Sequence, residues 1–340
     1  MDAIQTQAPP PAQGRGVWFA LLAVALTAVV AGCTQNVAPA VTPNLTPATA
    51  AWPRTLVDDE GTTIELAEPP ERVVSLSPAN TELVFALGAG DRLLGGTDFD
   101  DYPPEAAALP DVATFTGVII EQAIALEPDL VLAAGNNFTP AGDIERMREL
   151  GLTVLVVYAE TVDEALADIE LIGQALGADE QAADIVAGMR ARLAEVQAAV
   201  GSVGARPRVF YQIGSVPEIY APAPESFVAD MVALAGGEPI TTTDPAVFSI
   251  SVERLVEFDP EVIVLGDAAY GVCPAEVSAR PGWDAMTAVT NGAIRPVDDV
   301  IITRPGPRLA DGLAALALAI HPGLDIDPPP APPLCTEDGR

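Results

Sequence analysis

Short apolar runs alternate with polar turns and helical patterns along this chain, as expected for repeated strand–helix units. The first unit is a β-branched apolar run over 73–76 followed by Ser77 and Pro78, a typical helix cap and first-turn pair. A helix is predicted over 79–87, and Gly88 ends it. The strands predicted in this part of the chain are 73–76, 93–97 and 130–133, and a β-hairpin over 55–66 precedes them.

The segment 161–203 has a different pattern. It is rich in Ala, Leu, Glu and Gln and lacks proline, so it is predicted to be helical. After Gly177, apolar residues recur at spacings of three and four, which predicts one amphipathic helix over 179–200, about six turns long. Such a helix either joins two lobes as a stiff connection or covers the surface of a single domain.

An internal repeat favours two lobes. The segment EQAIALEPDLVL, which begins at Glu121, is echoed by ERLVEFDPEVIV, which begins at Glu253, and the glutamate lies seven residues before a proline in both. Each copy predicts a helix, a proline stop and a buried strand. We interpret the repeat as duplicated architecture with a cleft between the copies, although two helix-to-strand joints could also resemble each other by chance.

The second half of the chain repeats the strand–helix pattern. The predicted elements are a strand over 208–214, a helix over 226–235, a late strand over 295–302 and a closing helix over 309–320. Residues 328–333 begin a proline-rich tail that can form neither element. The predicted fold class is therefore α/β, with two Rossmann-like lobes bridged by one long, rigid helix and a ligand cleft between the lobes.

The first 53 residues are predicted to lie outside this fold. Arg15 precedes an apolar run over 17–31 that is too short for a comfortable membrane span. The V-A-G-C sequence that ends at Cys33 resembles a lipobox, which predicts a lipoprotein signal peptide over 1–32 and a lipid on Cys33; the alternative is an uncleaved anchor. In both cases the folded part is predicted to lie outside the cytoplasmic membrane. The segment 33–53 is rich in Ala, Pro and Thr and is predicted to be a tether.

Length and composition are consistent with two modest domains that have cores of their own. The chain has 340 residues, of which 49% are hydrophobic. The predicted boundaries are 54–177 for the N-terminal lobe, 178–203 for the bridging helix, 204–322 for the C-terminal lobe and 323–340 for the tail. A formal charge of −32, with no lysine, argues against nucleic acid or an anionic lipid surface as the partner.

Catalytic and metal-binding motifs find little support. The single histidine, His321, lies at a predicted helix end before a proline, which excludes a site built from several imidazoles. The chain has no G-x-S-x-G, no P-loop and no full dinucleotide fingerprint. An anchored metal-cofactor enzyme would need ligands in the cleft, where only Cys273 could reach, and a ligand-sensing receptor is a further alternative.

The motifs RVVSLSPANTEL, TDFDDYPPEA and LEPDLVLAAG resemble those of ABC-importer substrate-binding proteins for cobalamin and iron-siderophores, most closely the cobalamin-binding branch. PRVFYQIG, SVERLVEFDPEVIVLG and RPGPRLADGLAALA continue the resemblance in the family's order, and together the motifs span roughly 54–322. The resemblance implies a non-enzymatic, monomeric protein without an intrinsic cofactor or a metal site of its own. It also implies a small metal-chelate ligand, and a permease dimer with its ATPase as partner.

Ligands in open α/β sheets bind at the carboxyl ends of the strands, and the loops there predict the binding residues. The predicted ligand-binding residues are Pro78, Ala79, Asn80, Phe99, Phe115, Asn137 and Phe138 in the first lobe, and Ser215, Phe248, Tyr270 and Arg304 in the second. By resemblance, Phe99 and Phe115 stand where cobalamin-binding relatives place aromatic rings against the corrin. Those relatives tend to carry a tryptophan where this chain reads A-G-N-N-F at 134–138, so Phe138 is the candidate replacement.

The ligand is therefore predicted to be cobalamin or a related corrinoid. A ferric siderophore, or heme, is the alternative within the same family. An anionic siderophore would need arginine, and Arg304 and Arg308 are the candidates.

Two further pairs complete the prediction. By resemblance, Glu121 and Glu225 present one carboxylate per lobe to arginine pockets of the permease, where charge pairing sets orientation and encounter rate. Cys273 and Cys335 are an even pair in an exported chain, which predicts a disulfide that fastens the tail to the second lobe; two unpaired thiols are the alternative.

Overall fold

The computed structural model describes residues 51–114, 116–135, 138–330, 332, 334 and 335. The described chain begins with an antiparallel hairpin of β1 (Arg54–Val57) and β2 (Thr63–Leu66), as predicted. Alternation places Leu56, Ile64 and Leu66 on its buried face. Asp58 fixes the turn, because its Oδ1 accepts hydrogen bonds from the backbone amides of Glu60 and Thr62.

The first lobe is built on a six-stranded sheet with the order β6-β5-β4-β3-β7-β8, parallel except for β6 against β5. Its strands are β3 (Val73–Ser75), β4 (Leu93–Thr97), β5 (Asp111–Thr114), β6 (Gly117–Val118), β7 (Leu130–Ala134) and β8 (Val154–Val157). Its helices are α1 (Pro78–Ala86), α2 (Ile120–Ala125), α3 (Ala141–Glu149) and α4 (Val162–Leu176). Val73, Val131 and Leu155 are buried from both faces, as parallel strands between helices require.

The predicted caps and breaks are present. The hydroxyl of Ser77 accepts a hydrogen bond from the amide of Asn80 at the start of α1, and Pro78 occupies the first turn. Thr161 and Glu164 add a capping box, which was not predicted, at the start of α4. Gly177, with φ 71°, ends α4 in the left-handed conformation that glycine adopts without cost.

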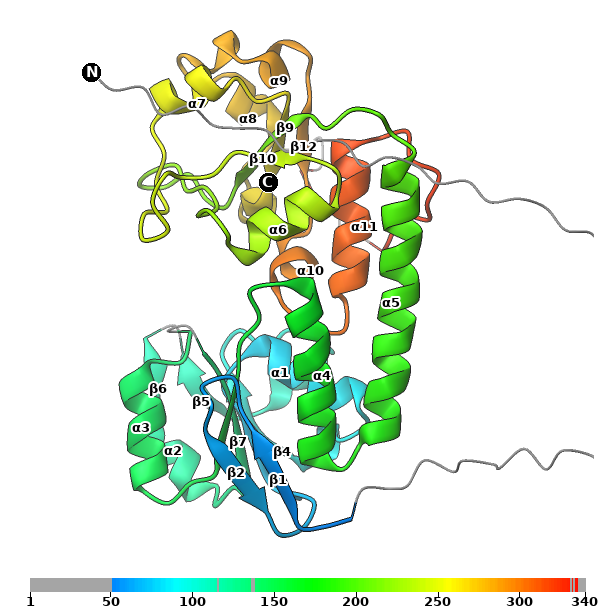
Figure 1. The fold of residues 1–340 in the computed structure, drawn as a ribbon. Coiled ribbons are helices and arrows are strands. Elements are labelled where there is room, and N and C mark those ends of the chain that lie inside the picture. The colour runs from blue at the N-terminus through cyan, green and yellow to red at the C-terminus, as the bar shows by residue number, and fades with distance from the viewer. Residues whose placement is uncertain (1–50, 115, 136–137, 331, 333, 336–340) are drawn as a thin grey trace, which may run out of the picture. The chain divides into compact units, whose positions relative to one another are not determined.

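A helix of 23 residues, α5 (Asp179–Gly201), follows this turn. Its buried side chains include Met189, Leu193 and Val196, which belong to the stripe expected from the sequence, whereas Val186 is buried in place of Ile185. The helix packs against α4 and against α11 (Leu309–Ile320), which lies beside it near the other end (Figure 1). One continuous cluster of buried apolar residues extends from the first sheet through α4 and α5 to α11.

The second lobe has a parallel four-stranded sheet with the order β10-β9-β11-β12. Its strands are β9 (Arg208–Gln212), β10 (Glu238–Pro239), β11 (Val262–Leu265) and β12 (Ile294–Pro296). Its helices are α6 (Phe227–Leu234), α7 (Val252–Phe258), α8 (Pro274–Ser278), α9 (Thr287–Thr290), α10 (Asp299–Thr303) and α11. Short 3₁₀ helices lie at Gly90–Arg92, Ala106–Ala108, Gly266–Tyr270 and Trp283–Ala285.

The sequence repeat corresponds to equivalent elements in the two lobes. The first copy forms α2 and then β7, and the second forms α7 and then β11. Strand β7 lies between β3 and β8, and β11 lies between β9 and β12, so both copies supply an inner strand of their sheet. The expectation of a helix followed by a buried strand is confirmed in both.

The late strand predicted over 295–302 is wrong. Only β12 (Ile294–Pro296) is a strand, and α10 (Asp299–Thr303) follows it. The carboxylate of Asp298 accepts a hydrogen bond from the amide of Val300 and caps this helix. The β-branched run after Asp299 favours a strand locally, but the acidic cap and the packing of α10 against α11 decide the conformation.

The proline-rich tail returns to the second lobe. Beyond α11 the described tail residues form neither helix nor strand, in agreement with the sequence. A disulfide joins Cys335 to Cys273, which precedes α8, and the two Cα atoms lie 5.5 Å apart. In the described part of the chain, none of the helices is both long enough and apolar enough for a membrane span.

Candidate ligand-binding site

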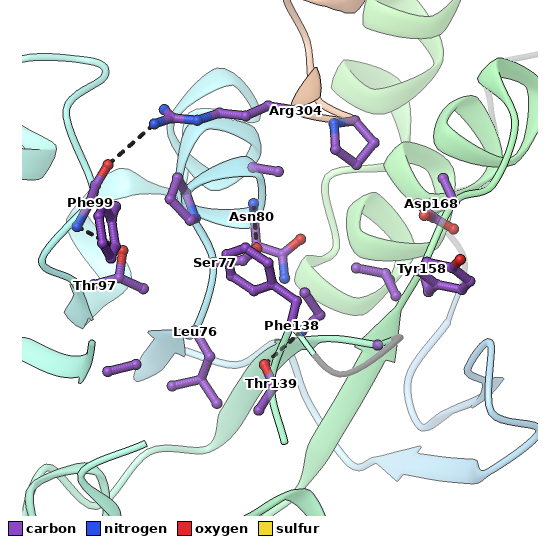
Figure 2. A pocket seen from close by; sticks show the side chains of 18 of the residues that line it. Leu76, Ser77, Asn80, Thr97, Phe99, Phe138, Thr139, Tyr158, Asp168 and Arg304 are labelled. Atoms are coloured by element: carbon purple, nitrogen blue, oxygen red, sulfur yellow. Dashed lines mark hydrogen bonds between the residues drawn. The ribbon is translucent and has the colours of Figure 1, made fainter. Parts of the chain in front are cut away.

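A cavity of about 680 Å³ lies at the carboxyl ends of the strands of the first lobe. Residues that follow β3, β4, β7 and β8 line it, and they include Ser77, Phe99, Phe138 and Tyr158 (Figure 2). The second lobe adds Phe227 of α6 and the segment Thr303, Arg304 and Pro305 that follows α10. The position agrees with the rule that open α/β sheets bind ligands at this edge.

The turn between β3 and α1 forms a rigid part of the wall. The side-chain amide of Asn80 donates a hydrogen bond to the carbonyl oxygen of Ala133 at 3.3 Å, which ties α1 to the end of β7. The hydroxyl of Thr81 donates to the hydroxyl of Ser75 or to the carboxylate of Asp100, each at 2.8 Å. Because these polar groups are buried and satisfied, the turn that carries Pro78 and Ala79 is fixed before a ligand arrives.

The loop after β4 presents Phe99 to the cavity. Asp100 accepts hydrogen bonds from the amide of Thr97 at 2.9 Å and from its hydroxyl at 2.8 Å. Burial raises the pKa of the Asp100 carboxyl, while the bonds from Thr97 and Thr81 and the charge of Arg304 oppose that rise. With Asp100 turned inward, the neighbouring ring of Phe99 remains 47% exposed.

The loop after β7 carries Phe138. The amide of Thr139 donates to the carbonyl of Ala134 at 2.9 Å, and the Thr139 hydroxyl accepts from the amide of Ala134 at 3.2 Å. Phe138 directly precedes Thr139, and its ring is 63% exposed. Gly135 is required there, since a Cβ atom at this position would lie 2.9 Å from the Cβ of Tyr158.

The wall near β8 contains Tyr158 and Asp168 (Figure 2). The Tyr158 hydroxyl donates to the carboxylate of Glu160 at 2.9 Å. Asp168, on α4, is buried and lies against the carboxylate of Asp59. Burial first, and then the charge of Asp59 and a hydrogen bond with it, raise the pKa of Asp168 to about 8. Asp168 therefore presents a mostly protonated carboxyl to the cavity at neutral pH.

Arg304 is held by carboxylates. Its Nη1 lies 2.6 Å from Oδ1 of Asp101 and 3.2 Å from Oε1 of Glu82, and its Nη2 donates to the carbonyl of Phe99 at 3.4 Å (Figure 2). Arg308 donates from Nε to Oε2 of Glu82 at 2.9 Å, and its guanidinium lies 4.0 Å from the ring centroid of Tyr102. Glu82 thus joins two arginines of the second lobe to α1 of the first.

The structure brings together six of the predicted ligand-binding residues. The cavity is lined by Pro78, Ala79, Asn80, Phe99, Phe138 and Arg304. Three others do not line it. Ser215 donates to Asp267 at 3.1 Å and accepts from Arg280, while Phe248 and Tyr270 are exposed on the second lobe. Phe115, Asn137 and the lipidation candidate Cys33 lie outside the described residues.

Sequence reasoning missed Tyr158, Asp168, Phe227 and Glu82. Tyr158 directly follows the buried run V-L-V-V of β8, so the same rule that selected the other loops could have found it. Glu82 stands alone as an acid within the apolar helix α1, which is a signal for a buried partner. Asp168 and Phe227 carried no comparable signal.

The docking candidates Glu121 and Glu225 are both exposed. Glu121 lies in the first turn of α2, and Glu225, with φ 59°, directly precedes Ser226, which caps α6. Among the described residues, neither carboxylate takes part in an ion pair with an arginine. Likewise, no cluster of three or more metal-ligating side chains occurs in that part of the chain.

Comparisons with known proteins agree with this geometry. The chain matches the family described as periplasmic binding protein over residues 73–300. It is 32% identical over 311 residues to the uncharacterized ABC transporter substrate-binding lipoprotein YvrC of Bacillus subtilis, which covers 90% of this chain and 97% of that protein. It is 31% identical over 319 residues to a cobalamin-binding protein of Halobacterium salinarum, with 90% and 85% covered.

A solved structure gives the same result. The periplasmic vitamin B12 binding protein BtuF of Vibrio cholerae superimposes with a TM-score of 0.66 at 28% identity, covering 74% of this chain and 97% of that one. The resemblance read from the motifs is thereby confirmed at the level of the family and of the two-lobed fold. Since the family match spans most of the folded part and the relatives align over nearly their whole lengths, this chain belongs to the periplasmic binding protein family.

Proposed function

We propose that this protein is the extracytoplasmic substrate-binding component of an ABC importer, and that it captures cobalamin or a related corrinoid and delivers it to the permease. The observation that carries the ligand assignment is the cavity wall, which is formed mostly by apolar and uncharged polar groups and whose arginine is already bound to carboxylates. A bulky ligand without strong net charge suits such a wall. The curated relatives named for cobalamin support the same choice.

The proposed mode of binding uses exposed rings on both lobes. Phe99 and Phe138 in the first lobe would hold the flat face of the ligand, because aromatic side chains bury a large apolar area and stack on π-systems. Ser215, Phe248 and Tyr270 of the second lobe do not line the cavity itself, so they would contact the part of the ligand that extends beyond it. A volume of about 680 Å³ falls within the roughly 300–1,000 Å³ typical of small-molecule pockets.

The remaining assignments belong to the same proposal. The lobes would be 54–177 and 204–322, joined by 178–203, which contains α5. A lipid on Cys33 would tether the protein to the membrane, and Glu121 and Glu225 would dock it on the permease dimer. No intrinsic cofactor or catalytic residue is required.

Calorimetric titration tests the ligand assignment. The chain from residue 34 onward is titrated with cyanocobalamin, dicyanocobinamide, a panel of ferric siderophores and hemin. We expect saturable binding of the corrinoids alone. Binding of a siderophore or of hemin alone would keep the transport function and replace the ligand, whereas binding of none of them would favour a sensing receptor or an enzyme.

Variants of the aromatic residues locate the site. Phe138→Ala and Phe99→Ala should each weaken corrinoid binding about 10- to 100-fold, equivalent to roughly 1.4–2.8 kcal/mol. Leu150→Ala is the matched control, because Leu150 is a comparably exposed apolar side chain away from the cavity lining. If neither phenylalanine variant changed the affinity for corrinoid, the ligand would have to bind outside this cavity.

A further inference from the structure

The buried carboxylate of Glu82 is bonded to two arginines from the other lobe. Its side chain is 3% exposed, and the partners Arg304 and Arg308 lie on either side of the loop that connects α10 to α11. Glu82 accepts from Nη1 of Arg304 at 3.2 Å and from Nε of Arg308 at 2.9 Å, and a second bond from Arg308 makes that contact bidentate.

This cluster sets the charge beside the cavity. Arg304 is the basic residue among the cavity-lining side chains, and the chain contains no lysine. The positive charges of Arg304 and Arg308 are matched by Glu82 and by Asp101, whose Oδ1 lies 2.6 Å from Arg304. The cluster therefore has no formal net positive charge with which to attract an anion.

An anionic ligand would meet guanidinium groups whose positive charge Glu82 already neutralises. Glu82 is removed from water, so its bonds to the arginines are weakly screened, and separating them would leave a buried charge unpaired. Asp101 differs in this respect, because its side chain is 61% exposed and water can replace Arg304 as its partner. The two carboxylates carry the same charge but differ in how firmly they hold the arginines.

We propose that Glu82 determines the charge specificity of the cavity: by binding Arg304 and Arg308, it makes the site select uncharged metal-bearing ligands over anionic ones. This inference rests on the proposed transport function and adds the residue that excludes the anionic members of the same ligand class. Arg304 then acts as a positioning residue for the loop of Phe99, through its bond to that carbonyl, rather than as an anion receptor.

The experiment compares two probes that differ by one charge. The full chain, purified in detergent, is titrated with cyanocobalamin and with the derivative in which one propionamide is hydrolysed to a carboxylate. Wild type should bind the monocarboxylate at least ~10-fold more weakly than cyanocobalamin, and Glu82→Gln should reduce this ratio to less than ~3-fold because Arg308 loses its carboxylate partner.

Matched variants separate the role of Glu82 from net charge. Asp101→Asn makes the same charge change at an exposed partner of Arg304 and should leave the ratio within ~2-fold of wild type. Glu82→Gln combined with Arg308→Gln should restore the wild-type ratio. An unchanged ratio in Glu82→Gln, or an equal change in Asp101→Asn, would overturn the inference.

Two further measurements keep the test decisive. If Glu82→Gln does not fold, Arg308→Gln alone should raise the discrimination against the monocarboxylate by ~3-fold or more, and a lowered ratio would contradict the inference. If wild type binds neither corrinoid, the proposed ligand is wrong, and the variants are titrated with a neutral ferric trihydroxamate and an anionic ferric tris-catecholate. Tighter binding of the catecholate by Glu82→Gln than by wild type would still support Glu82 as the residue that sets charge specificity. Unchanged catecholate binding would overturn the inference.

Discussion

Asp168, on α4, forms a carboxyl–carboxylate contact with Asp59, which lies in the turn between β1 and β2. The backbone amide of Tyr158 donates a hydrogen bond to Oδ2 of Asp59. Burial is the largest cause of the raised pKa of Asp168, about 8, and the negative charges of Asp59 and Glu164 add to it. Asp59 therefore connects Asp168, a buried carboxyl with a raised pKa, to Tyr158, and both of these residues line the cavity.

This relationship predicts a pH-dependent stability. The pKa of Asp168 is about 8 in the folded protein against its ordinary value of 3.8, so between these values the folded state keeps a proton that the unfolded state has lost. The contribution of Asp168 is full below about pH 4, declines by up to about 1.4 kcal/mol per pH unit as the pH rises, and is lost above about pH 8. Asp168→Asn removes this dependence.

Urea unfolding at pH 5 and pH 8 measures the effect. The free energy of unfolding of Asp168→Asn, relative to wild type, should be higher at pH 8 than at pH 5 by at least about 1 kcal/mol. Glu170→Gln, an exposed change on the same helix, should follow wild type at both pH values. An Asp168→Asn variant whose difference from wild type is the same at both pH values would contradict the assignment.

Gly312 of α11 fixes the close approach of this helix to α10. A Cβ atom there would lie 2.0 Å from the carbonyl oxygen of Ile301, a backbone atom that cannot rotate away. Gly312→Ala should therefore lower the free energy of unfolding by about 3 kcal/mol, and it should also weaken ligand binding because the Arg304–Arg308 loop connects the two helices.

Gly188 of α5 provides the control for this change. A Cβ atom at that position meets nothing within 4 Å, so Gly188→Ala should raise the free energy of unfolding by about 0.5–1 kcal/mol through helix propensity. Chemical denaturation of both variants tests the pair. Equal effects of the two substitutions would show that helix packing at Gly312 tolerates a side chain.

Local chemistry explains which parts of the fold were predictable. The Ser77 cap, the break at Gly177 and the apolar stripe of α5 depend on residues that are close to one another in sequence. All three are found in the structure. The prediction of a strand over 295–302 was wrong because Asp298 caps α10, and packing against α11 stabilises this helix. Propensity alone could not weigh a tertiary contact against a β-branched run.

The cavity was predictable only in part for the same reason. The loops after the strands could be selected from the buried runs that precede them, and this found Phe99 and Phe138. The partners of Arg304 and Arg308 could not be found this way, because Glu82 lies 222 and 226 residues from them in sequence. The sequence suggested arginines available to an anion, whereas the fold pairs both of them with an acid.

The disulfide between Cys273 and Cys335 closes a loop over a sequence separation of 62 residues. In the chain-entropy model, a loop of this length stabilises the folded state by about 4 kcal/mol. Reduction of the wild type, or the double variant Cys273→Ser with Cys335→Ser, should lower the free energy of unfolding by a similar amount. Urea unfolding with and without a reductant measures this, and the double variant should not respond to the reductant. A wild type whose unfolding is also insensitive to reductant would contradict the prediction.

The two exposed carboxylates Glu121 and Glu225 provide a test of docking. Each lies on a different lobe near a helix start, and charge pairing at such a rim changes orientation and association rate more than it changes ligand affinity. The double variant Glu121→Ala with Glu225→Ala should therefore lower uptake in cells about tenfold or more, while ligand affinity in solution stays within about twofold of wild type.

The matched control removes two other exposed carboxylates, with Glu145→Ala in the first lobe and Asp284→Ala in the second. Both double variants lose the same formal charge, so a general effect of net charge on encounter with the membrane would lower uptake equally. A specific docking role predicts that only the Glu121 and Glu225 pair affects uptake, and that raised salt weakens wild-type binding to the purified permease but has little effect on that variant. A parallel loss of ligand affinity in the Glu121 and Glu225 variant would assign these residues to the ligand site instead, since docking residues act after the ligand is bound.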